Sequence, residues 1–212
     1  MTRPRFTVRL TSQAVTAALL IALLLGGCGE KVPRLAALGP DEVIVAFGDS
    51  LTYGTGAAES ESYPAVLGAL IGRRVVRAGV PGEVTAQGLT RIEQVIEAHR
   101  PALMIVCLGG NDMLRRVDEA QVKKNLGEII RTIRARGIAV VLVGVPKPSL
   151  ITSAPSFYDE LAKEYDIPYE GKVVTEVMYQ LELKADPIHP NAKGYRRIAE
   201  AIAALLKKAG AI

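Results

Sequence analysis

Histidine, cysteine and aromatic side chains are scarce in this sequence. Its 212 residues include two His, two Cys and no Trp, and aromatic residues make up 5%. With so few histidines and no CxxC pair, a His- or Cys-based metal site is not expected, and no cofactor is predicted. No basic stripe with interleaved aromatic residues is present, which argues against nucleic acid as a partner.

The apolar run near the amino terminus is too short to cross a membrane as a helix. Residues 14–25 form an apolar segment of twelve residues, whereas a membrane span needs about 20. Arg3, Arg5 and Arg9 precede it and give the segment a positive start. This arrangement is typical of a signal peptide, which we place at residues 1–27.

A cysteine follows this segment directly. Residues 25–28 read LGGC, which resembles a bacterial lipobox, although Gly26 stands where Ala, Ser or Thr is usual. The resemblance implies a lipid on Cys28 and a lipid-anchored protein in the bacterial cell envelope, facing the periplasm or the exterior. The alternative is an ordinary secretory signal with an incidental cysteine.

Without the leader the chain is almost neutral. Residues 1–27 hold three of the 26 Lys and Arg and none of the 22 Asp and Glu, so 23 cations remain against 22 acids, a net charge of +1. Residues 28–42 contain Pro, Gly and charges and are expected to act as a tether after the lipidated cysteine. Residues 43–212 have the length of a single domain.

Apolar strand-like runs alternate with segments of helical periodicity. Strands are predicted at residues 43–47, 73–77, 102–108 and 138–145. Apolar residues recur at helical spacing within residues 89–96, 122–133 and 195–206. Strands alternating with helices predict an α/β domain with a parallel sheet covered on both faces. Cys107 lies inside the third run and is expected to be a buried core residue.

Ser50 follows the first predicted strand at its carboxyl end, in the sequence AFGDSLTYG. A serine at this point is either a turn residue or a nucleophile. As a nucleophile it needs a neighbouring base that removes its proton.

The base candidate lies just before the last predicted helix, in the sequence DPIHP. Asp186 and His189 are three residues apart, and flanking prolines restrict the backbone. This spacing can place the carboxylate beside the imidazole, fix the tautomer and stabilise the imidazolium that forms during attack. The alternative for His189 is a capping or packing role.

Two further post-strand loops offer hydrogen-bond donors for a developing oxyanion. Gly82 follows the second predicted strand, and Asn111 follows the third within the sequence GGND. Each loop by itself is consistent with an ordinary turn. However, the carboxyl ends of parallel strands open on one edge of the sheet, so these donors, Ser50 and the Asp186–His189 pair are expected to meet there.

These segments resemble the four blocks of the GDSL, or SGNH, hydrolases, in the order and approximate spacing of that family. The matching residues are Gly48-Asp49-Ser50-Leu51, Gly82, Gly109-Gly110-Asn111-Asp112 and Asp186-Pro187-Ile188-His189-Pro190. The resemblance implies a flavodoxin-like three-layer α/β/α fold. It also implies Ser50 as nucleophile, His189 as base, Asp186 as its orienting acid, and an oxyanion hole made by Ser50, Gly82 and Asn111.

The second block departs from the family pattern at two positions. Arg77 stands where Asn is frequent, and Glu83 stands where Asp often follows the glycine. Neither residue is expected to transfer a proton. We therefore expect the departures to affect the local loop and the substrate preference, and not the catalytic step.

The resemblance implies hydrolysis of carboxylic esters or thioesters, such as acyl esters or lysophospholipids. Deacetylation of an envelope polysaccharide or peptidoglycan is a second reading, and a non-catalytic acyl-binding lipoprotein is a third. Residues 146–156 contain three prolines and are expected to be irregular, either as a surface connection or as a wall of the substrate pocket.

Overall fold

A five-stranded parallel sheet forms the centre of the computed structural model, which describes residues 32–147 and 153–212. The strands are β1 (Ile44–Gly48), β2 (Val75–Gly79), β3 (Leu103–Cys107), β4 (Ala139–Val143) and β5 (Tyr169–Glu170). Their order is β2-β1-β3-β4-β5, the order of flavodoxin-like sheets, and the winding direction switches between β1 and β3. The predicted signal peptide and Cys28 lie outside the described residues.

The strand sequences explain this arrangement. β1 and β3 are buried along their whole length, as expected for apolar strands covered on both faces. β2 lies at one edge and is only half-buried, and it begins two residues later than the predicted strand at 73–77. β5, at the other edge, has two residues and was not predicted.

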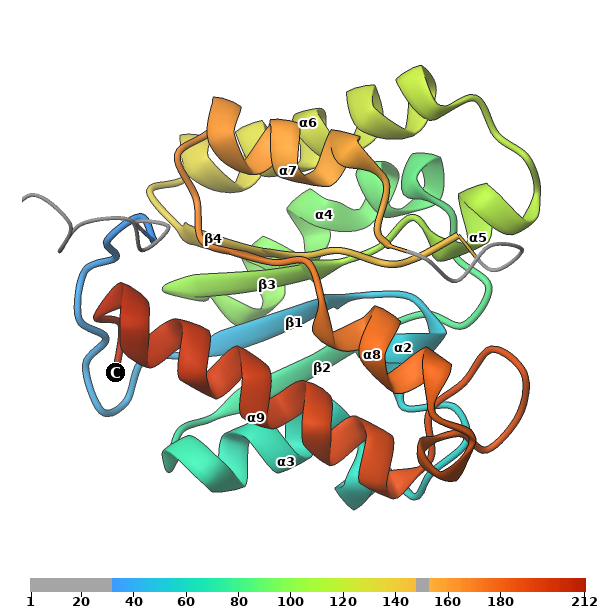
Figure 1. The fold of residues 1–212 in the computed structure, drawn as a ribbon. Helices are drawn as coiled ribbons and strands as arrows, with labels where there is room; N and C mark the ends of the chain where they lie inside the picture. Colours follow the sequence, from blue (N-terminus) through green and yellow to red (C-terminus); the bar gives the residue numbers. More distant parts are fainter. Residues whose placement is uncertain (1–31, 148–152) are drawn as a thin grey trace, which may run out of the picture. The chain divides into compact units, whose positions relative to one another are not determined.

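Helices cover both faces of the sheet. They are α2 (Ser50–Tyr53), α3 (Tyr63–Ile71), α4 (Thr85–His99), α5 (Gly110–Leu114), α6 (Glu119–Ala135), α7 (Ser156–Glu164), α8 (Val173–Tyr179) and α9 (Ala192–Ala209), with short 3₁₀ helices η1 (Glu59–Glu61) and η2 (Leu181–Leu183). Figure 1 shows α4, α6 and α7 on one face and α3, α8 and α9 on the other. The apolar stripe predicted for residues 122–133 is buried within α6. The domain therefore has three layers.

The register of β1, β2 and β3 determines where the loops that follow these strands begin. Gly48 at the end of β1 pairs with Gly79 of β2 and with Cys107 of β3. The three strands therefore end side by side. The loops that carry Ser50, Gly82 and Asn111 leave the sheet from one edge, as predicted.

The segment before β1 packs against the end of the chain. The N–H of Leu35 donates to the carbonyl of Ala209, and the N–H of Leu38 donates to the carbonyl of Ala211, both at 2.9 Å. The side chain of Leu38 is buried. The described part of the predicted tether thus contacts the domain at the amino ends of the strands. Among the described residues, no helix is long and apolar enough to span a membrane.

Candidate active site

Ser50 begins α2 immediately after the sheet. Its neighbour Asp49 is the N-cap, and the carboxylate oxygen Oδ1 of Asp49 accepts a hydrogen bond from the N–H of Leu51 at 3.0 Å. The turn can be this tight because residue 48 is glycine. A Cβ at Gly48 would lie 2.1 Å from the carbonyl oxygen of Cys107, closer than a side chain can approach. The local sequence therefore holds Ser50 at the strand end.

Ser50, His189 and Asp186 form a continuous hydrogen-bonded chain. His189 Nε2 lies 3.1 Å from Ser50 Oγ, and His189 Nδ1 lies 2.7 Å from Asp186 Oδ2. An ionised carboxylate can only accept, so Nδ1 carries the proton and donates to Asp186. In the neutral ring Nε2 is then the acceptor for the Ser50 hydroxyl, which is the arrangement that a general base requires.

The Asp186 carboxylate is held by its own backbone turn. Oδ1 accepts from the N–H groups of Ile188 at 2.8 Å and His189 at 2.9 Å. Partial desolvation acts to raise the pKa of Asp186, but these two N–H groups and the imidazole outweigh it, so the pKa is lowered. The carboxylate therefore stays ionised beside the imidazole.

The turn bearing these two residues is fastened at both ends. The N–H of Ala185 donates to the carbonyl of His189 at 2.9 Å, and Lys184 and Pro190 form an isolated antiparallel bridge. Asn191, the N-cap of α9, donates from Nδ2 to the carbonyl of Lys184 at 3.2 Å. His189 is thus held in place by contacts at the start of the last helix.

Asn111 enters the same cleft from α5. Its Nδ2 donates to the carbonyl of Glu83 at 3.0 Å and lies 3.3 Å from Asp49 Oδ2. Gly82, the residue before Glu83, has a φ of +78°, a left-handed conformation that favours glycine. The structure thus brings Ser50, His189 and Asn111 into one cleft and places Gly82 one residue from the Asn111 contact. The roles assigned to them stay predictions.

The cleft around Ser50 is mainly apolar. Its polar lining comes from Asp49, Ser50, Asn111 and His189. The remaining lining residues are Leu51, Gly110, Leu114, Val145, Pro146, Val174, Met178, Pro187 and Ile188. Val145 and Pro146 belong to the connection after β4, so its described start forms part of the cleft wall; residues 148–152 lie outside the described residues. No group of three potential metal-binding side chains occurs among the described residues.

Two polar side chains near the site, those of Asp49 and Arg91, were not assigned a role from the sequence. Asp49 has 2% of its surface exposed, and desolvation raises its pKa to about 7, with smaller contributions from Glu83 and Asp112. Arg91 of α4 forms an ion pair with Glu83, which is 4% exposed. An acid directly after a buried strand was a usable signal for Asp49. Nothing in the helical periodicity distinguishes Arg91.

The comparison with known families decides the assignment. Residues 46–197 match the model of the GDSL-like lipase/acylhydrolase family. The chain belongs to this family. It is therefore a GDSL hydrolase, and the predicted family resemblance is confirmed.

Characterised relatives agree with the family match. The chain is 30% identical to esterase TesA of Pseudomonas aeruginosa over 199 residues, which cover 88% of this chain and 98% of the relative. It is 29% identical to thioesterase 1/protease 1/lysophospholipase L1 of Escherichia coli K12, over 78% of this chain and 84% of the relative.

Solved structures agree as well. The crystal structure of TesA matches with a TM-score of 0.69 and 28% identity, over 79% of this chain and 99% of its own. AlinE4, an SGNH-hydrolase family esterase, matches with a TM-score of 0.60 and 33% identity, over 82% of this chain and 98% of its own. The predicted three-layer α/β/α fold is confirmed.

Proposed function

We propose that this GDSL hydrolase cleaves carboxylic esters and thioesters with Ser50 as the nucleophile, His189 as general base and Asp186 as the orienting acid. The observation that carries the proposal is the hydrogen-bonded chain from Ser50 Oγ through His189 to Asp186, at 3.1 and 2.7 Å. The backbone N–H groups of Ser50 and Gly82 and the Asn111 amide supply the oxyanion hole.

Catalysis proceeds in two steps. His189 Nε2 takes the hydroxyl proton while Ser50 Oγ attacks the acyl carbon, and the tetrahedral oxyanion accepts hydrogen bonds from the three donors. The leaving alcohol or thiol departs with the proton from His189. Water, deprotonated by the same imidazole, then attacks the acyl-serine, and the acid product is released as Ser50 recovers its proton.

The apolar cleft supports an acyl chain as the group that enters the site. Leu114, Val174, Met178 and Ile188 line it beside the nucleophile. Such a lining suits acyl esters and lysophospholipids better than the acetyl groups of a sugar polymer, which favour a shallow and polar cleft. The names of the relatives, which include esterase and lysophospholipase, point the same way.

The lipid anchor is part of the same proposal. The leader of residues 1–27 and the LGGC sequence support lipidation of Cys28 and a place in the cell envelope, where acyl-lipid substrates are at hand. Expression in a bacterium, followed by mass spectrometry of the mature amino terminus, tests this. We expect the wild-type protein to carry an acylated Cys28 and the Cys28→Ala variant to carry no lipid. An unmodified Cys28 in protein that is not bound to the membrane contradicts the proposal.

The decisive experiment for the activity combines a covalent probe with ester turnover. A fluorophosphonate is expected to label Ser50, located by mass spectrometry. The p-nitrophenyl esters of acetate, butyrate and decanoate measure turnover and chain-length preference. Ser50→Ala and His189→Ala are each expected to lower kcat roughly 10,000-fold or more, since the residues act as a unit.

Matched controls separate loss of chemistry from loss of fold. Ser60→Ala in η1 and His99→Ala at the end of α4 remove the same side chains elsewhere in the chain and should retain wild-type rates. Turnover by Ser50→Ala close to wild type would overturn the nucleophile assignment. Folded wild-type protein that binds acyl chains without turnover would be a binding protein, and acetate release confined to polysaccharide would favour deacetylation.

A further inference from the structure

A partly buried ion pair adjoins Gly82, one of the proposed oxyanion donors. The guanidinium of Arg91 in α4 donates to both carboxylate oxygens of Glu83, from Nε to Oε1 at 2.5 Å and from Nη2 to Oε2 at 2.6 Å. The Glu83 side chain is 4% exposed and that of Arg91 is 19% exposed. Two parallel hydrogen bonds of this kind fix the relative orientation of the two groups as well as their distance.

The same guanidinium also contacts the ends of two strands. Nη2 of Arg91 donates to the carbonyl of Ala78 in β2 at 3.0 Å and to that of Gly48 in β1 at 3.2 Å. Its Cζ lies 4.1 Å from the centre of the Phe47 ring. Arg91 thereby links the strand that leads to Ser50 with the strand that leads to Gly82.

Glu83 connects this link to the proposed oxyanion donors. Its backbone carbonyl accepts the hydrogen bond from Asn111 Nδ2, and the residue before it is Gly82. The fixed Glu83 side chain therefore restrains the backbone of residues 82 and 83. Gly82 supplies one proposed oxyanion donor, its N–H, and the carbonyl of Glu83 orients another, the amide of Asn111. Arg91 itself contacts Glu83 and the ends of β1 and β2, and its connection to Asn111 runs through Glu83.

We propose that Arg91 is a positioning residue for the oxyanion hole and acts through Glu83 on Gly82 and Asn111. Donors aimed in advance at the oxyanion stabilise it without reorganisation, and a displacement of about 1 Å costs about 100-fold in rate. The ion pair by itself is weak evidence for a role in stability, because desolvation of the buried Glu83 carboxylate offsets its attraction to Arg91. The proposal rests on the proposed function above.

The first test is Arg91→Lys in the full chain. Lysine keeps the charge but cannot form the two-pronged contact with Glu83 and also reach both strand carbonyls. We expect kcat for p-nitrophenyl butyrate to fall about tenfold or more while KM stays within about twofold. The pH at which kcat/KM reaches half its plateau should be unchanged, because the His189–Asp186 pair is not altered.

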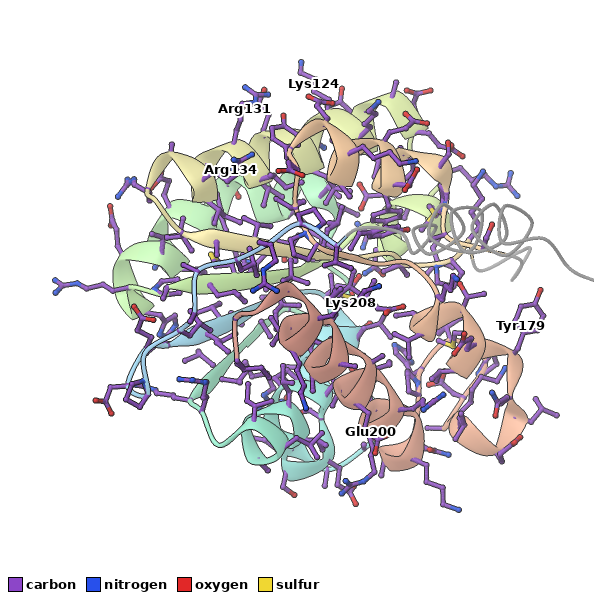
Figure 2. All side chains as sticks on the ribbon, turned by 60° about the vertical axis from the view of Figure 1, so that its left-hand side comes forward. Lys124, Arg131, Arg134, Tyr179, Glu200 and Lys208 are labelled. Atoms are coloured by element: carbon purple, nitrogen blue, oxygen red, sulfur yellow. The ribbon has the colours of Figure 1, made fainter. Side chains whose placement is uncertain are left out.

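A matched substitution controls for the loss of an arginine. Arg131 projects outward from α6, with 58% of its side chain exposed (Figure 2). Arg131→Lys is expected to keep both kcat and KM. If Arg91→Lys fails to fold, Glu83→Gln replaces it, because glutamine has nearly the same shape and removes only the charge and one strong acceptor. The same fall in kcat is expected.

A double-variant comparison tests whether Arg91 acts through the oxyanion hole. In an Asn111→Ala background, Arg91→Lys should cost clearly less than in the wild type, since the donor that it orients is gone. The proposal is overturned if Arg91→Lys lowers kcat by the same factor in the Asn111→Ala background as in the wild type. It is also overturned if Arg91→Lys raises KM at constant kcat, or if the folded variant has wild-type kinetics. Absence of turnover in the wild type would instead overturn the proposed function itself.

Discussion

At the scale of single residues, Asp49 is the unusual one. Asp49 is the N-cap directly before Ser50 and is 2% exposed; its carboxyl group accepts a hydrogen bond from the N–H of Leu51 and contacts the Asn111 amide. Two hydrogen bonds do not replace the water that an ionised carboxylate loses on burial. Desolvation therefore raises the pKa of Asp49 to about 7. The folded protein consequently binds a proton at this site more tightly than the unfolded chain does.

This binding makes stability depend on pH. Between pH 5 and pH 8 the unfolded chain keeps Asp49 ionised, while the folded protein loses its proton near pH 7. The contribution of Asp49 to the free energy of unfolding therefore falls as pH rises, by about 3 kcal/mol over this interval. Asp49→Asn does not titrate and keeps an acceptor for Leu51. Its stability relative to wild type should rise by that amount from pH 5 to pH 8.

Urea unfolding of both proteins at the two pH values measures this difference. Other titrating groups are common to the two chains and cancel in the comparison. A constant difference between variant and wild type at pH 5 and pH 8 would show that Asp49 does not carry the shifted pKa.

At the scale of elements, Asn191 joins the start of α9 to the turn that carries the proposed base. Its Oδ1 accepts from the N–H groups of Lys193 at 3.0 Å and Gly194 at 3.1 Å, which caps the helix. Its Nδ2 donates to the carbonyls of Glu182 at 2.8 Å and Lys184 at 3.2 Å. One amide group thus serves both the helix and the turn.

Two substitutions separate these tasks. Asn191→Ala removes both and is expected to lower the free energy of unfolding by about 1–2 kcal/mol and to lower kcat, because the turn bearing His189 is released. Asn191→Asp keeps the cap but has no donors for the turn, so stability should be closer to wild type while kcat falls as in the alanine variant. Thermal unfolding and ester turnover measure the two effects. Wild-type kcat in both variants would contradict the link.

The elements also show what the sequence could and could not predict. Strands β1, β3 and β4 follow from their apolar runs, because strands buried on both faces leave a strong signal. β5 is two residues long and lies at the sheet edge, and α8 is a short helix. Neither is long enough to show an apolar run or a helical periodicity in the sequence. Their formation depends on packing against neighbours that are distant in the sequence.

The candidate site divides in the same way. Ser50, Asn111 and the Asp186–His189 pair stand out because each follows or precedes a predicted element, and the family pattern joins them. The pairing of Arg91 with Glu83 could not be predicted, since a single arginine on a helix gives no sign of which way it points. It becomes evident only when α4 lies against the sheet.

At the scale of the whole molecule, the segment before β1 is hydrogen-bonded to the carboxyl-terminal end of the chain. Leu35 and Leu38 hydrogen-bond to the carbonyls of Ala209 and Ala211, and Leu38 is buried. These contacts lie at the amino ends of the strands, away from the cleft. They should contribute to stability without affecting catalysis.

A comparison of two shortened proteins tests this. A chain that begins at Val43 loses both hydrogen bonds and the buried leucine that a chain beginning at Val32 keeps. We expect a loss of about 3 kcal/mol. The melting temperature in calorimetry should accordingly fall by roughly 10 °C. kcat for p-nitrophenyl butyrate should be the same for both. Equal melting temperatures would show that the segment does not stabilise the domain.

The hydrogen bond between Ser50 and His189 joins residues 139 positions apart in the chain. During translation Ser50, the proposed nucleophile, therefore leaves the ribosome long before His189 is synthesised. A nascent or prematurely terminated chain contains Ser50 but not His189, so under the proposed mechanism it cannot hydrolyse an ester. If the proposed roles hold, activity requires synthesis at least as far as His189, and ester turnover then comes only from chains that are almost complete and folded.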